Sequence, residues 1–368
     1  MSGKDDPKGP VADRDATNAG VLRTALHSSV PSHFHDPVGL TFRILKSGNR
    51  DAIAALLQAG LRLGLGPVDM ALAWFARQSV AKGVAPARPV LFVTGPPRSG
   101  TTLLHQLLIQ NLPVAYVTNL ASLMPHSAAA GAAPLTASIA NASVRLQSYY
   151  GRTRALSGPS DGLEFWDRWF GPDRRAVPTQ IPPEAAAAMR FFFGRLEQKT
   201  GRPVVAKNNN LMASAHLVAE VLPTARFVCL RRDPVYLGQS LLKARKDIHG
   251  TSDISYGIDD LASAPNMPVD AVEDVCRQVR FYDELQQRQA ARLGRDRFIV
   301  IGYEDLCRDP AAVVKRLGHD ILGLTSDVRP IAPLSASRTR NLDNDEFRRL
   351  AERIGSQGDA RTALPPGR

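Results

Sequence analysis

The run PVLFVTGPPRSGTTLLHQLLIQ, residues 89–110, decides the fold. Its first part, PVLFVTG, is short, apolar and rich in valine, which predicts a buried strand from Pro89 to Gly95. Its last part, from Thr101 onward, carries apolar residues at helical spacing. Between the two lies a tight loop that contains two glycines and two prolines. A strand, a glycine loop and a helix in this order indicate an α/β fold.

The same order of strand and helix returns three times further along the chain. Apolar runs stand at 203–207, 225–232 and 297–306, and helical segments separate them. None of these runs alternates strictly between apolar and polar residues, as expected for strands that are buried on both faces of a parallel sheet. We therefore expect a doubly wound α/β fold, in which helices flank a mostly parallel central sheet with a P-loop-like architecture.

Length and composition fit one large domain. The chain has 368 residues, of which 44% are hydrophobic and 22% charged, and we expect a single domain over residues 39–330. Its first part, 41–85, has apolar residues at helical spacing that are interrupted between Gly64 and Pro67. This lead-in predicts a pair of helices, followed by an α/β core at 89–323.

The two ends of the chain lack the pattern of the core. Residues 1–38 are rich in Asp, Gly, Pro and Ser, which predicts a flexible arm, and residues 331–368 predict a tail or a helix. The N-terminus has charges of both signs and no apolar segment, unlike a signal peptide. No stretch reaches eighteen uninterrupted apolar residues, so we expect no membrane span. The alanine-rich stretch 128–142 fits either a helix or a low-complexity loop.

Charge and cysteine usage narrow the class of protein. Lys and Arg number 46 against 35 Asp and Glu, and a formal charge of +11 favours an anionic partner. The basic residues are scattered without interleaved aromatics, which disfavours nucleic acid. The three cysteines, Cys229, Cys276 and Cys307, lack the spacing of a zinc site or a disulfide framework. We expect a cytoplasmic protein without a metal ion and make no prediction of its oligomeric state.

The loop GPPRSGTT, Gly95–Thr102, has the composition of a phosphate cradle. Its glycines allow backbone N–H groups to point at an anion, and the helix that follows adds the partial positive charge of its N-terminus. In a nucleoside triphosphatase the residue after the second glycine is a lysine that reaches the β and γ phosphates. Here that residue is Thr101, and the cation is Arg98 inside the loop. The loop is therefore poorly suited to ATP.

This loop resembles the 5′-phosphosulfate loop of sulfotransferases that use 3′-phosphoadenosine 5′-phosphosulfate (PAPS). The family pattern, Pro-(Lys/Arg)-Ser-Gly-Thr-Thr, is matched in order by Pro97, Arg98, Ser99, Gly100, Thr101 and Thr102. The resemblance implies that the loop backbone and the two threonine hydroxyls hold the 5′-phosphate. It also implies that Arg98 neutralises charge on the bridging oxygen as the sulfuryl group leaves.

The second motif of the family follows downstream, in FVCLRRDPVYLGQS. It supplies Arg232, Pro234 and Ser240, and an arginine at a strand end with a serine one turn into the next helix can converge on one anion. In PAPS that anion would be the 3′-phosphate. Arg231 is the neighbouring alternative, and the spacing to Ser240 favours Arg232. The late segment YEDL also resembles the family, and we interpret its Tyr303 and Glu304 as structural.

The catalytic base is the part of the pattern that this chain departs from. Lys207 lies at the offset of the lysine in the Lys-X-His segment of the cytosolic sulfotransferases, which implies a cofactor or transition-state role. The base histidine of that segment is replaced by Asn209, and an amide does not accept a proton usefully. The glutamate base of the tyrosylprotein sulfotransferases aligns with Asn119 or Thr118, so that base is absent too.

Four residues remain as candidates for the base. Glu164 is the first choice because Phe165 and Trp166 beside it would shield it from water and make it a better proton acceptor. His126 is the second choice because it follows a strand end, where sites of α/β folds form. Asp161 and His105 come next.

The sequence leaves three functions open. The leading one is transfer of a sulfuryl group from PAPS, without a metal, to a hydroxyl or an amine of a small molecule, carbohydrate or lipid, with release of 3′-phosphoadenosine 5′-phosphate (PAP). A catalytically degenerate PAPS- or PAP-binding protein is the second, because both family bases are missing. A P-loop kinase is the third, and Thr101 in place of the lysine counts against it.

Overall fold

The computed structural model describes residues 37–48, 50–80, 84–129, 155–260, 270–325 and 327–362. The predicted N-terminal arm lies outside the described residues except for its last two positions, which open a helix. Most of the alanine-rich stretch, from residue 130 to 142, also lies outside them. Within the described part, no helix has the length and apolar character needed to cross a bilayer.

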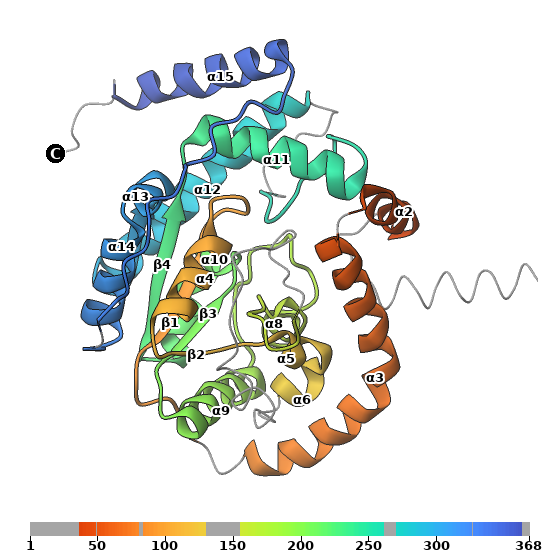
Figure 1. The fold of residues 1–368 in the computed structure, drawn as a ribbon, viewed down its shortest axis with the longest axis vertical. Coiled ribbons are helices and arrows are strands. Elements are labelled where there is room, and N and C mark those ends of the chain that lie inside the picture. The colour runs from red at the N-terminus through yellow and green to blue at the C-terminus, as the bar shows by residue number, and fades with distance from the viewer. Residues whose placement is uncertain are drawn as a thin grey trace, which may run out of the picture.

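A sheet of five parallel strands forms the centre of the molecule, in the order β2-β3-β1-β4-β5 (Figure 1). The strands are β1 (Val90–Thr94), β2 (Ala115–Tyr116), β3 (Val204–Lys207), β4 (Ala225–Arg231) and β5 (Phe298–Gly302). Four of them coincide with the four apolar runs, and all of their pairings are parallel. The predicted doubly wound α/β fold is therefore confirmed.

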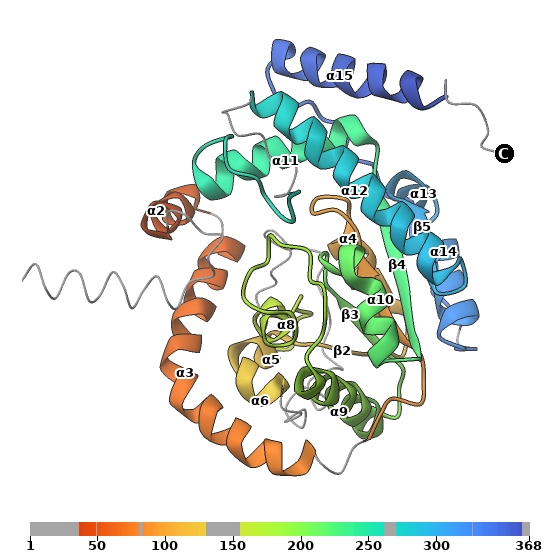
Figure 2. The same cartoon turned by 180° about the vertical axis from the view of Figure 1, so that it is seen from behind.

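Both faces of the sheet are covered by helices because alternate residues of each strand point to opposite sides. Val90 and Phe92 of β1 pack into one hydrophobic cluster, and Leu91 and Val93 pack into the other. The first cluster is covered by α8 (Leu163–Phe170), α9 (Pro183–Thr200), α10 (Leu211–Val221), α11 (Pro234–His249) and α12 (Ala271–Leu293). The second is covered by α4 (Thr101–Asn111), α13 (Tyr303–Arg308), α14 (Pro310–Arg316) and η1 (Leu317–Ile321). Figure 2, from behind, shows α10 and α12 in front of the sheet, whereas Figure 1 shows α4 there.

The carboxyl ends of the strands meet at one edge of the sheet. Val93 pairs with Lys207 across β1 and β3, and Arg231 pairs with Gly302 across β4 and β5. The segments that follow these strands therefore lie next to one another. In an open parallel sheet this edge is where ligands bind.

The helical lead-in differs from its prediction in where it is interrupted. The helix α2 (Pro37–Ser47) ends well before Gly64, and α3 (Arg50–Val80) runs without interruption through Gly64 and Pro67. Proline removes only one backbone donor from the helix, and long helices with one interior proline bend rather than end. In Figure 1, α3 follows an arc around α5 (Asn119–Leu123), α6 (Pro125–Ala129) and α8.

The C-terminal part combines both predicted forms, an extended segment and a helix. Residues 327–343 form neither helix nor strand. The helix α15 (Asn344–Thr362) follows them. Gln239 of α11 binds the extended segment twice: its Nε2 donates to the Thr339 carbonyl at 2.9 Å, and its Oε1 accepts from Asn341 N–H at 2.9 Å. The segment is thereby held along the carboxyl edge of the sheet.

Candidate active site

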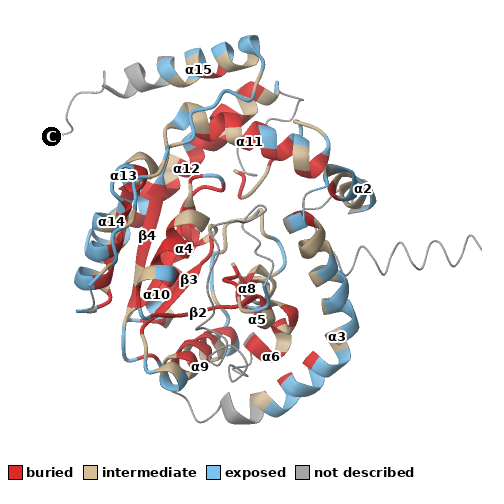
Figure 3. Ribbon diagram, in the orientation of Figure 1, coloured by how far each residue is buried: buried red, intermediate tan, exposed pale blue. Residues whose placement is uncertain are grey.

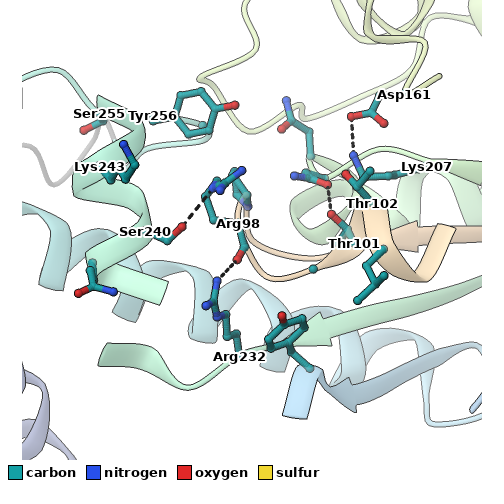
Figure 4. Close-up of a pocket in the computed structure, with 18 of the residues that line it drawn as sticks. Arg98, Thr101, Thr102, Asp161, Lys207, Arg232, Ser240, Lys243, Ser255 and Tyr256 are labelled. Carbon is teal, nitrogen blue, oxygen red and sulfur yellow. Dashed lines mark hydrogen bonds and ion pairs between the residues drawn. The ribbon is translucent and has the colours of Figure 1, made fainter. Parts of the chain in front are cut away.

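A pocket of about 430 Å³ lies at the carboxyl edge of the sheet (Figure 4). Its lining contains several cationic side chains from loops that are distant in sequence: Arg98, Arg174, Arg175, Lys207, Arg232 and Lys243. Among the described residues of the lining, Asp161 is the only carboxylate. This excess of positive charge favours a ligand with more than one negative charge.

Residues Gly95–Gly100 connect β1 to α4, and we call them the phosphate loop. Two of them have backbone dihedral angles that few residue types adopt. Arg98 has φ +74°, the only left-handed non-glycine residue in the described part of the chain, and Gly100 has φ +97°. A Cβ atom on Gly100 would lie 2.4 Å from Tyr303 Cδ2, so a side chain does not fit there. The loop therefore turns tightly above Tyr303 and leads into α4 with Thr101 and Thr102 facing the pocket.

Ser99 is placed differently from the other residues of the loop motif. Its side chain is fully buried, and its Oγ has no hydrogen-bond partner among the described residues. Pro97, Arg98, Gly100, Thr101 and Thr102 line the pocket, whereas Ser99 does not. The hydroxyl of Ser99 thus lies beneath the loop.

Three residues of the two motifs come together in one corner of the pocket. Arg98 Nε donates to Ser240 Oγ at 3.1 Å, and Arg232 Nη1 donates to the Arg98 carbonyl at 2.8 Å. Arg232 Nη2 donates to the Ser337 carbonyl at 2.8 Å, and its guanidinium stacks 4.9 Å above the ring of Tyr303. Arg231 does not line the pocket. Of the two arginines, Arg232 lines the pocket together with Ser240.

Arg232 is positioned by carbonyl oxygens, and no carboxylate of the described residues forms an ion pair with it. Burial lowers the pKa of Arg232, and the nearby Arg98 acts in the same direction, whereas Glu304 and Asp233 oppose the shift. Asp233 instead caps α11 by accepting from Val235 N–H at 2.9 Å, and its own N–H donates to Glu304 Oε1 at 3.1 Å. Glu304 thus fastens α11 to the end of β5.

On the opposite wall of the pocket, Lys207 forms an ion pair with Asp161 (Figure 4). Lys207 ends β3 and is only 2% exposed, while Asp161 lies just before α8. Asn209 lies two residues beyond Lys207, and its Oδ1 accepts from Thr101 Oγ1 at 3.0 Å. Asn209, which stands where the family has a histidine, therefore holds the end of the phosphate loop through a hydrogen bond.

The two preferred base candidates lie outside the pocket lining. Glu164 pairs with Arg62 of α3 at 3.0 Å and is 9% exposed, and His126 Nε2 lies 3.0 Å from Arg168 Nη1. Trp166 packs into the core, and a residue two positions away on a helix points about 200° elsewhere, so Trp166 cannot shield Glu164. Side chains one or two positions apart on a helix face different directions and do not pack on each other.

His105 is buried on α4, also away from the pocket lining. Burial lowers the pKa of His105 to about 3, and the positive charge of Lys207 acts in the same direction. The ring is therefore neutral near pH 7 and has no contact with the pocket. Asp161 alone of the four candidates is found there.

Several lining residues were missed by the sequence reasoning. Lys243 lies one helical turn after Ser240, and the i, i+3 spacing on α11 could have revealed it. Arg174 and Arg175 lie in an irregular segment without a periodic signal. Arg174 binds Asp167 through two hydrogen bonds of 2.7 Å, and Arg175 lies 3.6 Å from Asp259. Both guanidiniums are thus fixed at the rim by carboxylates.

Comparison with known proteins identifies the family. The model of the sulfotransferase family matches residues 89–327. Similar solved structures include the sulfotransferase STF9 from Mycobacterium avium, which is 16% identical over 96% of this chain and 90% of that one, with a TM-score of 0.48. Sulfotransferase STF1 from Mycobacterium tuberculosis H37Rv is 17% identical over 94% of this chain and 99% of that one, with a TM-score of 0.47. No curated protein matches the chain significantly. Because the family match spans more than half of its length, the chain belongs to the sulfotransferase family and is a transferase enzyme.

Proposed function

We propose that this enzyme transfers a sulfuryl group from PAPS to an acceptor hydroxyl or amine and releases PAP. The observation that carries the proposal is the meeting of two anion-binding groups in one pocket: the phosphate loop, and the pair of Arg232 and Ser240. A donor with phosphates at both its 5′ and 3′ positions needs two such groups. A kinase would need only the first.

The residues of the pocket fit this donor. The tight turn at Gly100 exposes the N-terminus of α4, whose N–H groups and partial positive charge suit the 5′-phosphosulfate. Thr102 would add a hydroxyl donor, and Thr101 would do so after its hydroxyl turns away from Asn209 Oδ1, to which it donates here. Arg232 and Ser240 would hold the 3′-phosphate through a forked guanidinium and a hydroxyl. The donor supplies an activated sulfuryl group.

The transfer step needs positive charge and a proton acceptor. The acceptor oxygen or nitrogen attacks sulfur in line, and the bond from sulfur to the bridging phosphate oxygen breaks with its electron pair going to PAP. Arg98 and Lys207 would stabilise the charge on the sulfonate and on that oxygen. The proton of the attacking group must pass to a base within hydrogen-bond reach.

We assign the base to Asp161 in place of Glu164 and His126. Asp161 is the carboxylate of the pocket lining, and its ion pair with Lys207 fixes one of its oxygens beside the cation that would face the sulfonate. This placement brings the proton acceptor and the charge stabiliser together. The degenerate-binder alternative, which rests on the missing family bases, loses its support if Asp161 acts as base.

Calorimetry tests the donor assignment directly. PAP should bind without magnesium, and more tightly than ATP with magnesium, because the loop carries Arg98 and lacks the lysine that reaches a γ-phosphate. Tighter binding of magnesium ATP would refute the proposal. The cytoplasmic location that we propose is supported by the three cysteines, which are all free and buried.

A further inference from the structure

Much of α3 is exposed (Figure 3), and many of its exposed side chains are large and apolar. In the described part of the chain thirteen large hydrophobic side chains are exposed, and eleven of them lie on α2 and α3. Those on α3 are Leu57, Leu61, Leu63, Val68, Met70, Leu72, Trp74 and Phe75. We call these eight residues the α3 face. A soluble monomer rarely exposes so many contiguous apolar side chains.

The polar residues of α3 point in the opposite direction, toward the protein. Between Leu57 and Phe75 these are Gln58, Arg62 and Asp69. Arg62 pairs with Glu164, and Asp69 is 1% exposed and accepts hydrogen bonds from the start of α6. The helix is thus inverted relative to a helix that faces water, since its polar side is inside and its apolar side is outside.

The spacing of the outer residues indicates that another helix packs on them. Leu57, Leu61, Gly64, Val68, Ala71 and Phe75 follow one another at intervals of four and three residues, and all six are exposed. This repeat is typical of a helix–helix seam. A Cβ atom added to Gly60 or Gly64 would have nothing within 4 Å, although glycine destabilises a helix interior. Close approach of a partner helix explains why these positions are small.

We infer that α3 packs against α3 of a second copy of this chain, in a two-fold symmetric dimer. A two-fold interface must be complementary to itself, and an uncharged apolar strip meets that requirement without a partner of opposite charge. The five large side chains on or beside this seam are Leu57, Leu61, Val68, Leu72 and Phe75. At roughly 100 Å² each they offer about 500 Å² per partner, which reaches the total of about 1,000 Å² that a specific interface needs. No residue of α3 lines the active-site pocket, so both pockets of the dimer stay open.

Sedimentation velocity tests this dimer on the full-length protein. The parent chain should sediment as a dimer at micromolar concentration. Leu61→Glu and Val68→Glu should each raise the dissociation constant at least 100-fold, because the dimer would bury two like charges. Leu156→Glu is a matched control, since Leu156 is 45% exposed but lies outside the α3 face, and it should leave the dimer intact.

A pair of glycine variants tests the seam itself. Gly64 and Gly66 lie on the same helix, and both have open space for a Cβ atom, but they point about 200° apart. Gly64→Ala should weaken the dimer about tenfold, whereas Gly66→Ala should not, and both should preserve the thermal stability of the monomer. Equal effects of the two variants would overturn the packing at Gly64.

Two further results would overturn the proposal as a whole. One is a parent chain that is monomeric at 100 µM, since an apolar seam of about 500 Å² per partner should hold a dimer at that concentration. The other is a monomer that co-floats with vesicles of anionic phospholipid and loses this binding in Leu61→Glu, because the α3 face would then serve a membrane surface. PAP binding is measured in parallel and should be equal in all variants, which separates this test from that of the proposed function.

Discussion

At the scale of single residues, the site depends on which charges are already compensated. Arg174 and Arg175 face carboxylates, and Lys207 faces Asp161. Arg232 instead donates to two carbonyl oxygens, which orient the guanidinium without cancelling its charge. Among these pocket cations, Arg232 is therefore the one best prepared for a ligand anion.

This distinction leads to a prediction for the 3′-phosphate. Arg232→Ala and Ser240→Ala should each weaken PAP by about 1.5–3 kcal/mol, roughly 10- to 150-fold, because each removes a charge-assisted hydrogen bond. Adenosine 5′-monophosphate, which lacks that phosphate, should lose far less affinity in calorimetry. Arg231→Ala is the control, since Arg231 ends the same strand outside the pocket. Equal losses for both nucleotides would show a general structural effect.

A second prediction concerns the base. Asp161→Asn should lower turnover by on the order of 10²–10⁴ while PAP affinity stays within a few-fold, because the amide oxygen can still accept a hydrogen bond from Lys207 but cannot take a proton. Glu164→Gln and His126→Ala, outside the pocket, should turn over acceptor at nearly the parent rate. Steady-state rates with an identified acceptor decide this, and slow PAPS hydrolysis reports whether the donor half is intact. A large loss in Glu164→Gln alone would return the assignment to Glu164.

At the scale of elements, the sequence predicts what repeats locally. The four apolar runs became parallel strands because most of their residues are buried, on both faces of the sheet, and hydrophobicity alone reports that. The two-residue β2 is too short for any periodic signal. The break in the lead-in was placed wrongly at Gly64–Pro67, because the contacts of α3 with α5 and α6 come from residues far along the chain.

The site shows the same limit. The loop motif and the pair of Arg232 and Ser240 are contiguous patterns, and the sequence finds them. The choice between Glu164 and Asp161 depends on which lysine or arginine each one meets, and those partners lie 102 and 46 residues away. Patterns over a few neighbouring residues cannot predict ion pairs between residues so far apart in the sequence.

A third prediction tests how α11 supports the loop at 251–258, whose Ser255 and Tyr256 line the pocket. Arg245 of α11 is fully buried and donates to Ser252 O at 3.2 Å, to Asp274 Oδ2 at 2.7 Å and to Gln278 Oε1 at 2.8 Å. Arg245→Met should lower the free energy of unfolding by about 2–4 kcal/mol, because buried acceptors lose their donor.

Chemical denaturation measures this loss. The matched control is Arg288→Met, whose ion pair with Glu284 is exposed and should contribute less than about 1 kcal/mol. Comparable changes in the two variants would mean that the Arg245 network does not stabilise the fold.

At the scale of the whole molecule, one buried group should make stability depend on pH. His105 has a pKa of about 3 in the folded protein because burial disfavours its charged form. The unfolded chain binds that proton below a pKa of about 6.5, so stability falls as pH falls from about 6.5 toward 3. The free energy of unfolding should drop by about 2 kcal/mol from this residue between pH 7 and pH 5.

Urea titrations at the two pH values measure the drop. In His105→Gln this contribution should disappear, whereas His319→Gln, at an exposed position, should keep it. An unchanged pH dependence in His105→Gln would contradict the assignment.

The binding of Gln239 to Thr339 and Asn341 has a consequence for biosynthesis. The pocket draws on residues from Pro97 to Asn341, and Arg232 reaches Ser337 to be held in place. At about 5–20 residues per second, the ribosome adds Asn341 on the order of 10–50 s after Arg98. During that interval the nascent chain contains the phosphate loop but lacks Ser337 and Asn341, which line the same pocket. If PAP binds as proposed, we therefore expect it to stabilise the finished protein and to have little effect on the early stages of folding on the ribosome.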